Sequence, residues 1–139
     1  MKARAIEGLE PGGPLSPNVA RIISVRLDEL RGHADAALAP DAGEAQHDMR
    51  IAAKRLRYVL EIFSSCLDRE ADQARRAAKD LQSVLGDLHD CDLMLSKAAR
   101  IGSAVVLLRE RRERLFREFV ELWRREASRG TWAALERNL

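Results

Sequence analysis

Cysteine, proline and aromatic residues are scarce in this chain. Its 139 residues include two cysteines and four prolines, and only 4% of the residues are aromatic. The spacing of Cys66 and Cys91 matches neither a zinc motif nor a redox pair, so we expect reduced thiols packed on helices beside apolar residues. Few aromatics combined with 33% charged residues indicate charge-rich helices rather than a β-sandwich.

Several functional classes leave no signature in the sequence. It has no Gly-rich phosphate loop, no Ser/His/Asp order and no motif around a nucleophilic cysteine. No apolar run approaches the roughly 18 residues that a membrane span needs, and the amino terminus lacks the apolar region of a signal peptide. We therefore expect a cytoplasmic protein with no membrane partner.

A net charge of +2 makes a general electrostatic attraction to nucleic acid weak, so nucleic acid is not an expected partner. What the chain does have is 46% hydrophobic residues in a length typical of one domain, enough for a single packed core. Glycines and prolines, Pro14 among them, crowd residues 1–15 and predict a flexible N-terminal segment. Residues 16–139 are then expected to form a single helical domain.

Helical signals follow one another along the rest of the chain. Ser16 and Pro17 suit the N-cap and the first position of a helix that Pro40 ends. Further helices are predicted at about residues 43–67, 70–99 and 104–128. Gly130 caps the last of them and begins a short turn. Because no alternating strand pattern occurs, we predict an all-α antiparallel four-helix bundle with a short C-terminal helical turn.

The second predicted helix has one strongly basic side. At about 100° per residue, five polar side chains fall in one sector roughly 100° wide. These are His47, Arg50, Lys54, Arg57 and Tyr58. The opposite sector is apolar and holds Met49, Ala52, Ala53, Leu56, Val59, Leu60 and Phe63. We call the five polar residues the basic stripe.

The charges of this stripe suit an anionic ligand. Residues 48–58 contain four Arg or Lys residues against one Asp, a balance of +3. Arginine offers bidentate donors to phosphate oxygens, and lysine offers a mobile point charge. His47 can gain charge when an anion raises its pKa. An ordinary solvated basic face is the alternative interpretation.

Other cations could join the stripe. The third predicted helix carries Arg75, Lys79, Gln82 and His89 on the flank of its apolar side. If this flank faces the basic stripe across a groove, both converge on one polyanion. Arg21 of the first helix is a further candidate. The arginines of residues 109–117 alternate with glutamates, which predicts a solvated, salt-bridged face.

Two acidic features need explanation. Asp92 projects toward the apolar side of its helix, where an unpaired carboxylate would be costly. One interpretation is that it has a cationic partner, and an arginine of the second helix is a candidate. The other is that Asp92 lies near the helix end, where the helix already leaves the core. His47-Asp48 and His89-Asp90 both spell a His-Asp pair, as in helical metal-dependent phosphohydrolases. Adjacent helical residues point about 100° apart, so a metal site would need additional ligands from other helices.

Two ordered motifs resemble the CHAD family, the conserved histidine α-helical domain. The first is His47-x-x-Arg50-Ile51-x-x-Lys54-Arg55-Leu56-Arg57-Tyr58, and the second is Leu81-Gln82-x-x-Leu85-Gly86-x-x-His89-Asp90-x-Asp92. The resemblance covers about residues 44–95. It implies a helical protein that binds inorganic polyphosphate through a basic groove.

Carried over residue by residue, the resemblance makes His47 the motif histidine, with Arg50, Lys54, Arg55 and Arg57 as its basic companions. Residues Leu81, Gly86, Asp90 and Asp92 of the second motif would serve packing and the orientation of the cations. Arg55 lies at the side of the stripe by helix angle. The expected polyphosphate site is His47, Arg50, Lys54, Arg55, Arg57, Tyr58, Arg75, Lys79, His89 and Arg21.

The chain departs from the family in size. Family domains usually have two related helical halves, whereas this chain holds one copy of each motif and most resembles the second half. Either the single bundle binds a shorter stretch of anion, or two chains form a homodimer that rebuilds the two-halved domain. Ile51 and Ile62, beside the basic stripe, are candidates for such an interface or for contact with the fourth helix.

We therefore expect a non-catalytic bundle that binds polyphosphate and needs neither cofactor nor metal, with association with polyphosphate granules as a further expectation. Two alternatives stay open. One is a metal-dependent phosphohydrolase that uses His47, Asp48, His89 and Asp90. The other is a scaffold bundle whose basic face docks an acidic protein.

Overall fold

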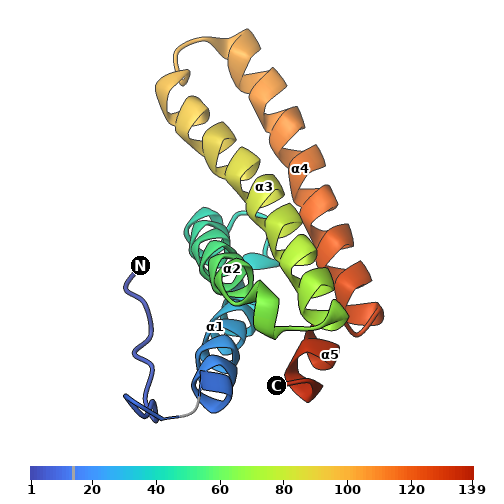
Figure 1. The fold of residues 1–139 in the computed structure, drawn as a ribbon. Helices are drawn as coiled ribbons and strands as arrows, with labels where there is room; N and C mark the ends of the chain where they lie inside the picture. The colour runs from blue at the N-terminus through green and yellow to red at the C-terminus, as the bar shows by residue number, and fades with distance from the viewer. Residues whose placement is uncertain (14) are drawn as a thin grey trace.

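A computed structural model describes residues 1–13 and 15–139. The described chain is helical, with connecting segments and no strand among its residues. Five α-helices and one short 3₁₀ helix follow one another (Figure 1). They are α1 (Leu15–Ala37), α2 (Gly43–Ile62), η1 (Ser64–Cys66), α3 (Arg69–Lys97), α4 (Gly102–Ser128) and α5 (Thr131–Arg137). The all-α prediction is confirmed.

Helix α1 begins slightly earlier than the sequence suggested. Its first residue is Leu15, so Ser16 lies inside the first turn and not before it. Pro17 also lies in this turn, where its missing N–H has no intrahelical acceptor to lose. The helix ends at Ala37, ahead of Pro40. Pro14, one of the expected helix breakers, lies outside the described residues.

Helix α2 ends earlier than predicted, at Ile62 rather than near residue 67. The chain tightens into η1 at Ser64–Cys66, where the Cys66 N–H donates to the carbonyl oxygen of Phe63 at 2.9 Å. This early end corrects the expectation for one cysteine. Cys66 is free and exposed in η1, whereas Cys91 is free and buried on α3, as expected.

The remaining helix ends have local causes. Asp68 caps α3 by accepting a hydrogen bond from the Ala71 N–H at 3.3 Å. Helix α4 ends at Ser128, and Gly130 turns the chain with a positive φ of 70° before α5. The predicted short C-terminal turn is therefore the helix α5, with Trp132 and Leu135 buried.

Helix α3 is the centre of the packing. It contacts α2 along one side and α4 along another, while α1 packs on α2 and α5 covers the base of α3 and α4. The core combines leucines and alanines of these helices with Phe119 of α4, which is 0% exposed. The alanines on α3 let the neighbouring helices approach closely, and the buried apolar surface provides most of the stabilisation.

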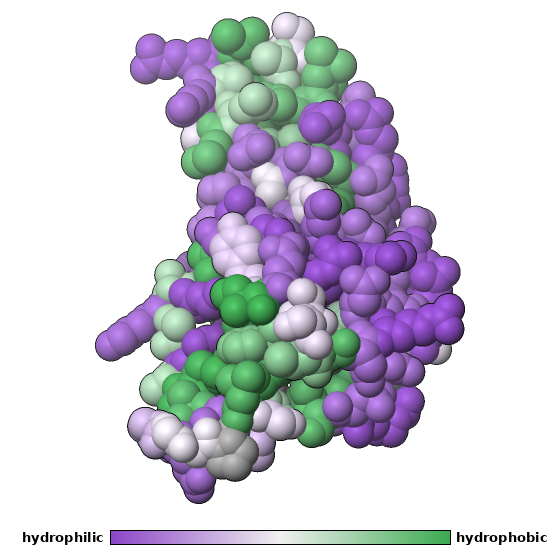
Figure 2. Space-filling view, in the orientation of Figure 1, coloured by the Kyte–Doolittle hydropathy of each residue, from purple (hydrophilic) through white to green (hydrophobic). Residues whose placement is uncertain are grey.

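The helices differ in reach, and this shapes the molecule. The C-terminal part of α3 and the N-terminal part of α4 form a hairpin that extends past α1 and α2 (Figure 1). Apolar side chains gather at its free end (Figure 2). Among them, Met94 is 56% and Leu107 is 66% exposed. The free end of the bundle therefore consists of α3 and α4 alone. None of the described helices is long and apolar enough to cross a membrane.

The N-terminal segment lies along α1 and is held by polar contacts. The Arg4 N–H donates to the buried carboxylate of Glu29, which also pairs with Arg26 at 2.8 Å. Arg21 donates to the carbonyl oxygen of Glu7 at 2.8 Å. Backbone groups of the segment therefore find partners on the bundle.

Candidate functional site: a cationic groove between α2 and α3

A groove of about 350 Å³ runs between α2 and α3. The close packing of these two helices brings Arg50 and Arg57 of the basic stripe beside Lys79 and Gln82 of α3. The other expected residues of the two helices, His47, Lys54, Tyr58 and His89, lie outside the lining of this groove. Its lining residues are Arg50, Arg57, Lys79, Gln82, Ser83, Gly86, Asp87 and Asp90. We call this feature the α2–α3 groove. It contains three cations, and two carboxylates stand along its α3 side.

Arg50 crosses the groove at Gly86. A Cβ atom placed on Gly86 would lie 3.1 Å from Nε of Arg50, so the absence of a side chain there makes room for the guanidinium. The Nε atom is buried and has no hydrogen-bond partner among the described residues. A buried donor without a partner is costly, and a ligand oxygen would satisfy it.

Arg57 is more firmly held. Its Nε donates to Oε1 of Gln82 at 2.8 Å, and its terminal nitrogen pairs with Glu61 at 2.6 Å. The guanidinium also lies 4.5 Å from the ring centroid of Tyr58, and Nζ of Lys54 lies 6.0 Å from the same ring. Tyr58 is therefore flanked by two cations at the exposed edge of the stripe.

The two motif histidines meet face to face. The rings of His47 on α2 and His89 on α3 stack with centroids 4.0 Å apart and planes 22° from parallel. Burial lowers the pKa of His47 below its ordinary value of 6.5, and the neighbouring His89 and Arg50 lower it further. His47 is therefore biased toward the neutral form until an anion approaches.

Three predicted site residues are engaged elsewhere. Arg75 donates to Asp72 at 2.9 and 3.1 Å, and this hydrogen bond lowers the pKa of the Asp72 carboxyl. Arg55 donates to the carbonyl oxygen of Met1 at 3.0 Å. Arg21 donates to the N-terminal segment as described above. Thus Arg21 and Arg55 contact the N-terminal segment, and neither lines the α2–α3 groove.

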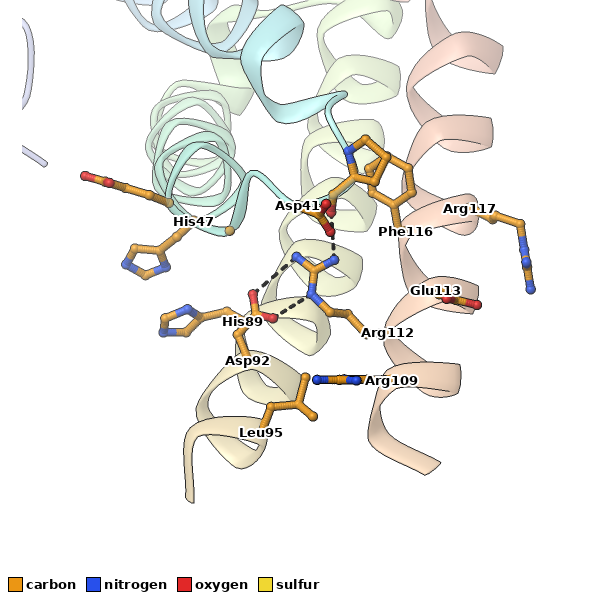
Figure 3. A pocket seen from close by; sticks show the side chains of 13 residues that line it. Asp41, His47, His89, Asp92, Leu95, Arg109, Arg112, Glu113, Phe116 and Arg117 are labelled. Atoms are coloured by element: carbon orange, nitrogen blue, oxygen red, sulfur yellow. Dashed lines mark hydrogen bonds and ion pairs between the residues drawn. The ribbon is translucent and has the colours of Figure 1, made fainter. Parts of the chain in front are cut away.

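A larger cavity of about 940 Å³ opens beside the histidine pair, where α2 begins and the α3–α4 hairpin continues (Figure 3). His47 and His89 line one side of it, and Arg109, Arg112 and Arg117 of α4 line another. Sequence patterning treated these arginines as part of a salt-bridged face. Among the described residues they form no ion pair with the glutamates of α4, and only Arg112 is paired.

Arg112 joins three segments. It pairs with Asp92 at 2.5 Å and donates to the carbonyl oxygen of Pro40 at 2.8 Å (Figure 3). It also donates to Oε1 of Gln46 at 2.7 Å. Gln46 is only 2% exposed and donates in turn to Ala39 at 3.0 Å. Asp92 therefore has a cationic partner, as one reading of the sequence required, but the partner comes from α4 rather than α2.

Sequence reasoning missed Gln46 and Arg112, because each gains its role only from residues distant along the chain. A signal for Gln46 existed, since it is a polar residue beside apolar positions of α2. The close contact of Gly43, at the start of α2, was also missed. A Cβ atom there would lie 3.1 Å from a carboxylate oxygen of Asp92.

The His-Asp pairs were the basis of the metal alternative. His47 and His89 do come together, but they present ring faces to each other rather than converging nitrogens. Within residues 1–13 and 15–139, no group of three or more His, Cys, Asp or Glu side chains is placed to hold a metal ion. No observation of the described chain therefore favours a metal centre.

The helical packing and the groove define an all-α protein with a cationic cleft between its two central helices. The CHAD domain family matches residues 2–99, which comprise nearly all of the N-terminal segment and the whole of α1, α2, η1 and α3. The chain belongs to this family. No curated protein and no solved structure matches the chain. Helices α4 and α5 lie beyond the matched residues.

Proposed function

We propose that this protein binds inorganic polyphosphate in the α2–α3 groove. The CHAD domain family is associated with polyphosphate binding and is generally a binding rather than a catalytic family. The observation that carries the proposal is the meeting of Arg50, Arg57 and Lys79 in one groove beside the histidine pair. Among the described residues, Arg50 and Lys79 form no ion pair that a ligand would have to break.

The groove suits a repeating phosphate chain better than a base-bearing polymer. Side-chain cations replace the counterions of the polyanion, so binding needs charge and phosphate geometry only. Proteins that bind single-stranded nucleic acid generally use aromatic platforms for the bases. Along this stripe Tyr58 is the one aromatic side chain, and its ring is already flanked by Lys54 and Arg57.

The wider setting of binding belongs to the same proposal. The protein acts without catalysis in the cytoplasm, in association with polyphosphate granules. A second copy of the chain lengthens the cationic path by placing two grooves in one assembly. Ile62 on α2 is 72% exposed and remains open to a neighbouring molecule.

Removal of two cations from the stripe tests the proposal. Arg50→Ala combined with Lys54→Ala should weaken binding of long-chain polyphosphate by at least about tenfold, because each lost phosphate contact removes counterion release. Binding is measured by isothermal titration calorimetry at several salt concentrations. The wild-type affinity should fall steeply with salt, and the variant should have a shallower slope.

A matched control removes two cations elsewhere. Arg124→Ala with Arg137→Ala changes the net charge equally, on exposed positions of α4 and α5. Its affinity should stay near that of the wild type, and circular dichroism should give equal helical content for all three proteins. Equal affinity of the stripe variant and the control would contradict the groove assignment. Tighter binding of single-stranded RNA than of polyphosphate would contradict the ligand assignment.

A further inference from the structure

The α3–α4 hairpin has an outer face with opposite character at its two ends. We define this outer face by residues spaced seven apart on each helix, which lie on one side of a helix. On α3 they are Asp80, Asp87 and Met94, and on α4 they are Leu107, Arg114 and Glu121. All six residues are exposed. The acids lie toward the base of the hairpin, and the apolar residues lie toward its tip.

The base of the outer face is an acidic cleft of about 360 Å³. Its carboxylates come from both helices and are Asp80, Asp87, Glu118 and Glu121, with Arg125 as the cation of the lining. Among the described residues, none of these four carboxylates forms an ion pair, whereas six other acids of the chain do. Val84 and Leu122 form the apolar floor of the cleft.

The tip of the hairpin has the complementary chemistry. No Asp or Glu occurs between Asp92 and Glu110, and the cations Lys97 and Arg100 stand at the turn. Met94 and Leu107 are exposed on the outer face, and Ile101 at the turn is 59% exposed. The apolar end is visible in Figure 2. Exposed apolar residues gathered in this way are typical of an interaction site.

From this complementarity we propose that two copies of the chain pack their hairpins antiparallel through the outer face. A two-fold axis then brings the apolar, cationic tip of each copy into the acidic cleft of the other. The tip lies about 25 Å from the cleft along α3, at 1.5 Å per residue, so the overlap extends over more than four helical turns. The four helices of the two hairpins form an intermolecular bundle.

The second copy is favoured over a different partner because one surface supplies both halves of the contact. Tip-to-tip packing would instead bring the cations of two turns together without a carboxylate to balance them. The inference does not depend on polyphosphate binding. The interface residues used in the test, Lys97, Arg100, Glu118 and Glu121, do not line the α2–α3 groove.

Charge reversal gives a sharp test, with sedimentation velocity and light scattering as the readout. The wild type should be dimeric. Lys97→Glu with Arg100→Glu makes the tip acidic, and Glu118→Lys with Glu121→Lys makes the cleft basic. Each double variant should dissociate, its dimer dissociation constant rising by about tenfold or more, because tip and cleft then repel. An equimolar mixture of the two should form a heterodimer, and the chain with all four changes should dimerise again.

Controls separate the interface from folding and from net charge. Arg69→Glu with Arg137→Glu alters the same amount of charge at the start of α3 and the end of α5, and it should remain dimeric. Leu107→Asp should give a monomer with unchanged helical content. A wild type that is monomeric at high concentration, or a dimer that survives both charge reversals, would overturn the proposal. Sedimentation of the monomer with anionic lipid vesicles would reassign the tip to a membrane surface and equally overturn it.

Discussion

Single residues decide what the groove can hold. Arg50 has a buried Nε without a partner among the described residues, and a Cβ at residue 86, which is glycine, would lie 3.1 Å from that Nε. His47 is kept toward its neutral form by burial and by His89 and Arg50. Both residues are thus poised to gain from an anion, one by hydrogen bonding and the other by protonation.

Filling the space at residue 86 should weaken binding. In Gly86→Ala the new Cβ lies 3.1 Å from Nε of Arg50 and requires a small shift of that side chain, so affinity for polyphosphate should fall measurably. Helical content should not fall, because alanine favours a helix by about 1 kcal/mol over glycine. Gly102→Ala is the matched control, since nothing lies within 4 Å of its Cβ position. Loss of binding in both variants would mean that Gly86 has no special role.

The histidine pair should make binding pH-dependent. The pKa of His47 is lowered in the free protein, and a bound polyanion raises it, so binding takes up protons and affinity should increase as pH falls through 6.5 and below. Calorimetric titrations across this range, in buffers of different ionisation enthalpy, measure the proton uptake. His47→Asn should flatten the profile. A pH-independent affinity in the wild type would exclude His47 from the site.

The same pKa shift affects folding with a defined sign. Because the folded state disfavours the proton on His47, the unfolded chain binds more protons near its ordinary pKa of 6.5. The contribution of His47 to the free energy of unfolding is fully present above pH 6.5, and it is lost as the pH falls toward the lowered pKa. Acidification should therefore lower the free energy of unfolding and at the same time tighten anion binding. Bound polyphosphate should offset the lost stability.

At the scale of the elements, α4 is more than a cover for the core. Arg112 on α4 reaches Asp92 on α3, Gln46 on α2 and the carbonyl of Pro40 in the preceding loop. Its side chain is 15% exposed and that of Asp92 is 33% exposed. One guanidinium thereby fixes where α2 begins relative to the hairpin, and with it the position of His47.

Arg112→Met should lower stability by about 1–3 kcal/mol, because the buried amide of Gln46 and the Asp92 carboxylate lose their donor. Thermal unfolding should show a Tm lower by several degrees. Arg112→Lys should recover little of the loss, since an ammonium cannot reach three separated acceptors as a guanidinium does. Arg124→Met, on an exposed part of α4, serves as the control and should leave Tm nearly unchanged.

At the scale of the whole molecule, the unequal reach of the helices creates two surfaces. The α2–α3 groove lies where α2 packs on α3, and the tip of the outer face lies at the end of the hairpin that extends past α1 and α2 (Figure 1). Asp87 lines both the groove and the acidic cleft, so the two surfaces adjoin along α3. The two proposed interactions, self-association and anion binding, therefore use neighbouring surfaces of one small chain.

The sequence by itself determined the helical class, most of the helix limits and the basic stripe. Periodicity of apolar residues and the left-handed Gly130 act within a few residues, so a local reading recovers them. Two motifs placed His47 and His89 on the second and third helices, whereas the stacking of their rings comes from the structure. The early end of α2 was missed, because Phe63 continues the apolar pattern past Ile62, the last residue of the helix.

Only the tertiary structure decided which cations meet. Arg21 and Arg55 fit the basic pattern but donate to the N-terminal segment, while Arg112 fits a solvated pattern but joins three segments. Helix angles fix the direction of a side chain around its own axis, whereas its partners depend on how helices cross and where each one stops. That information is non-local, and so the groove and the outer face of the hairpin come from packing rather than from any one stretch of sequence.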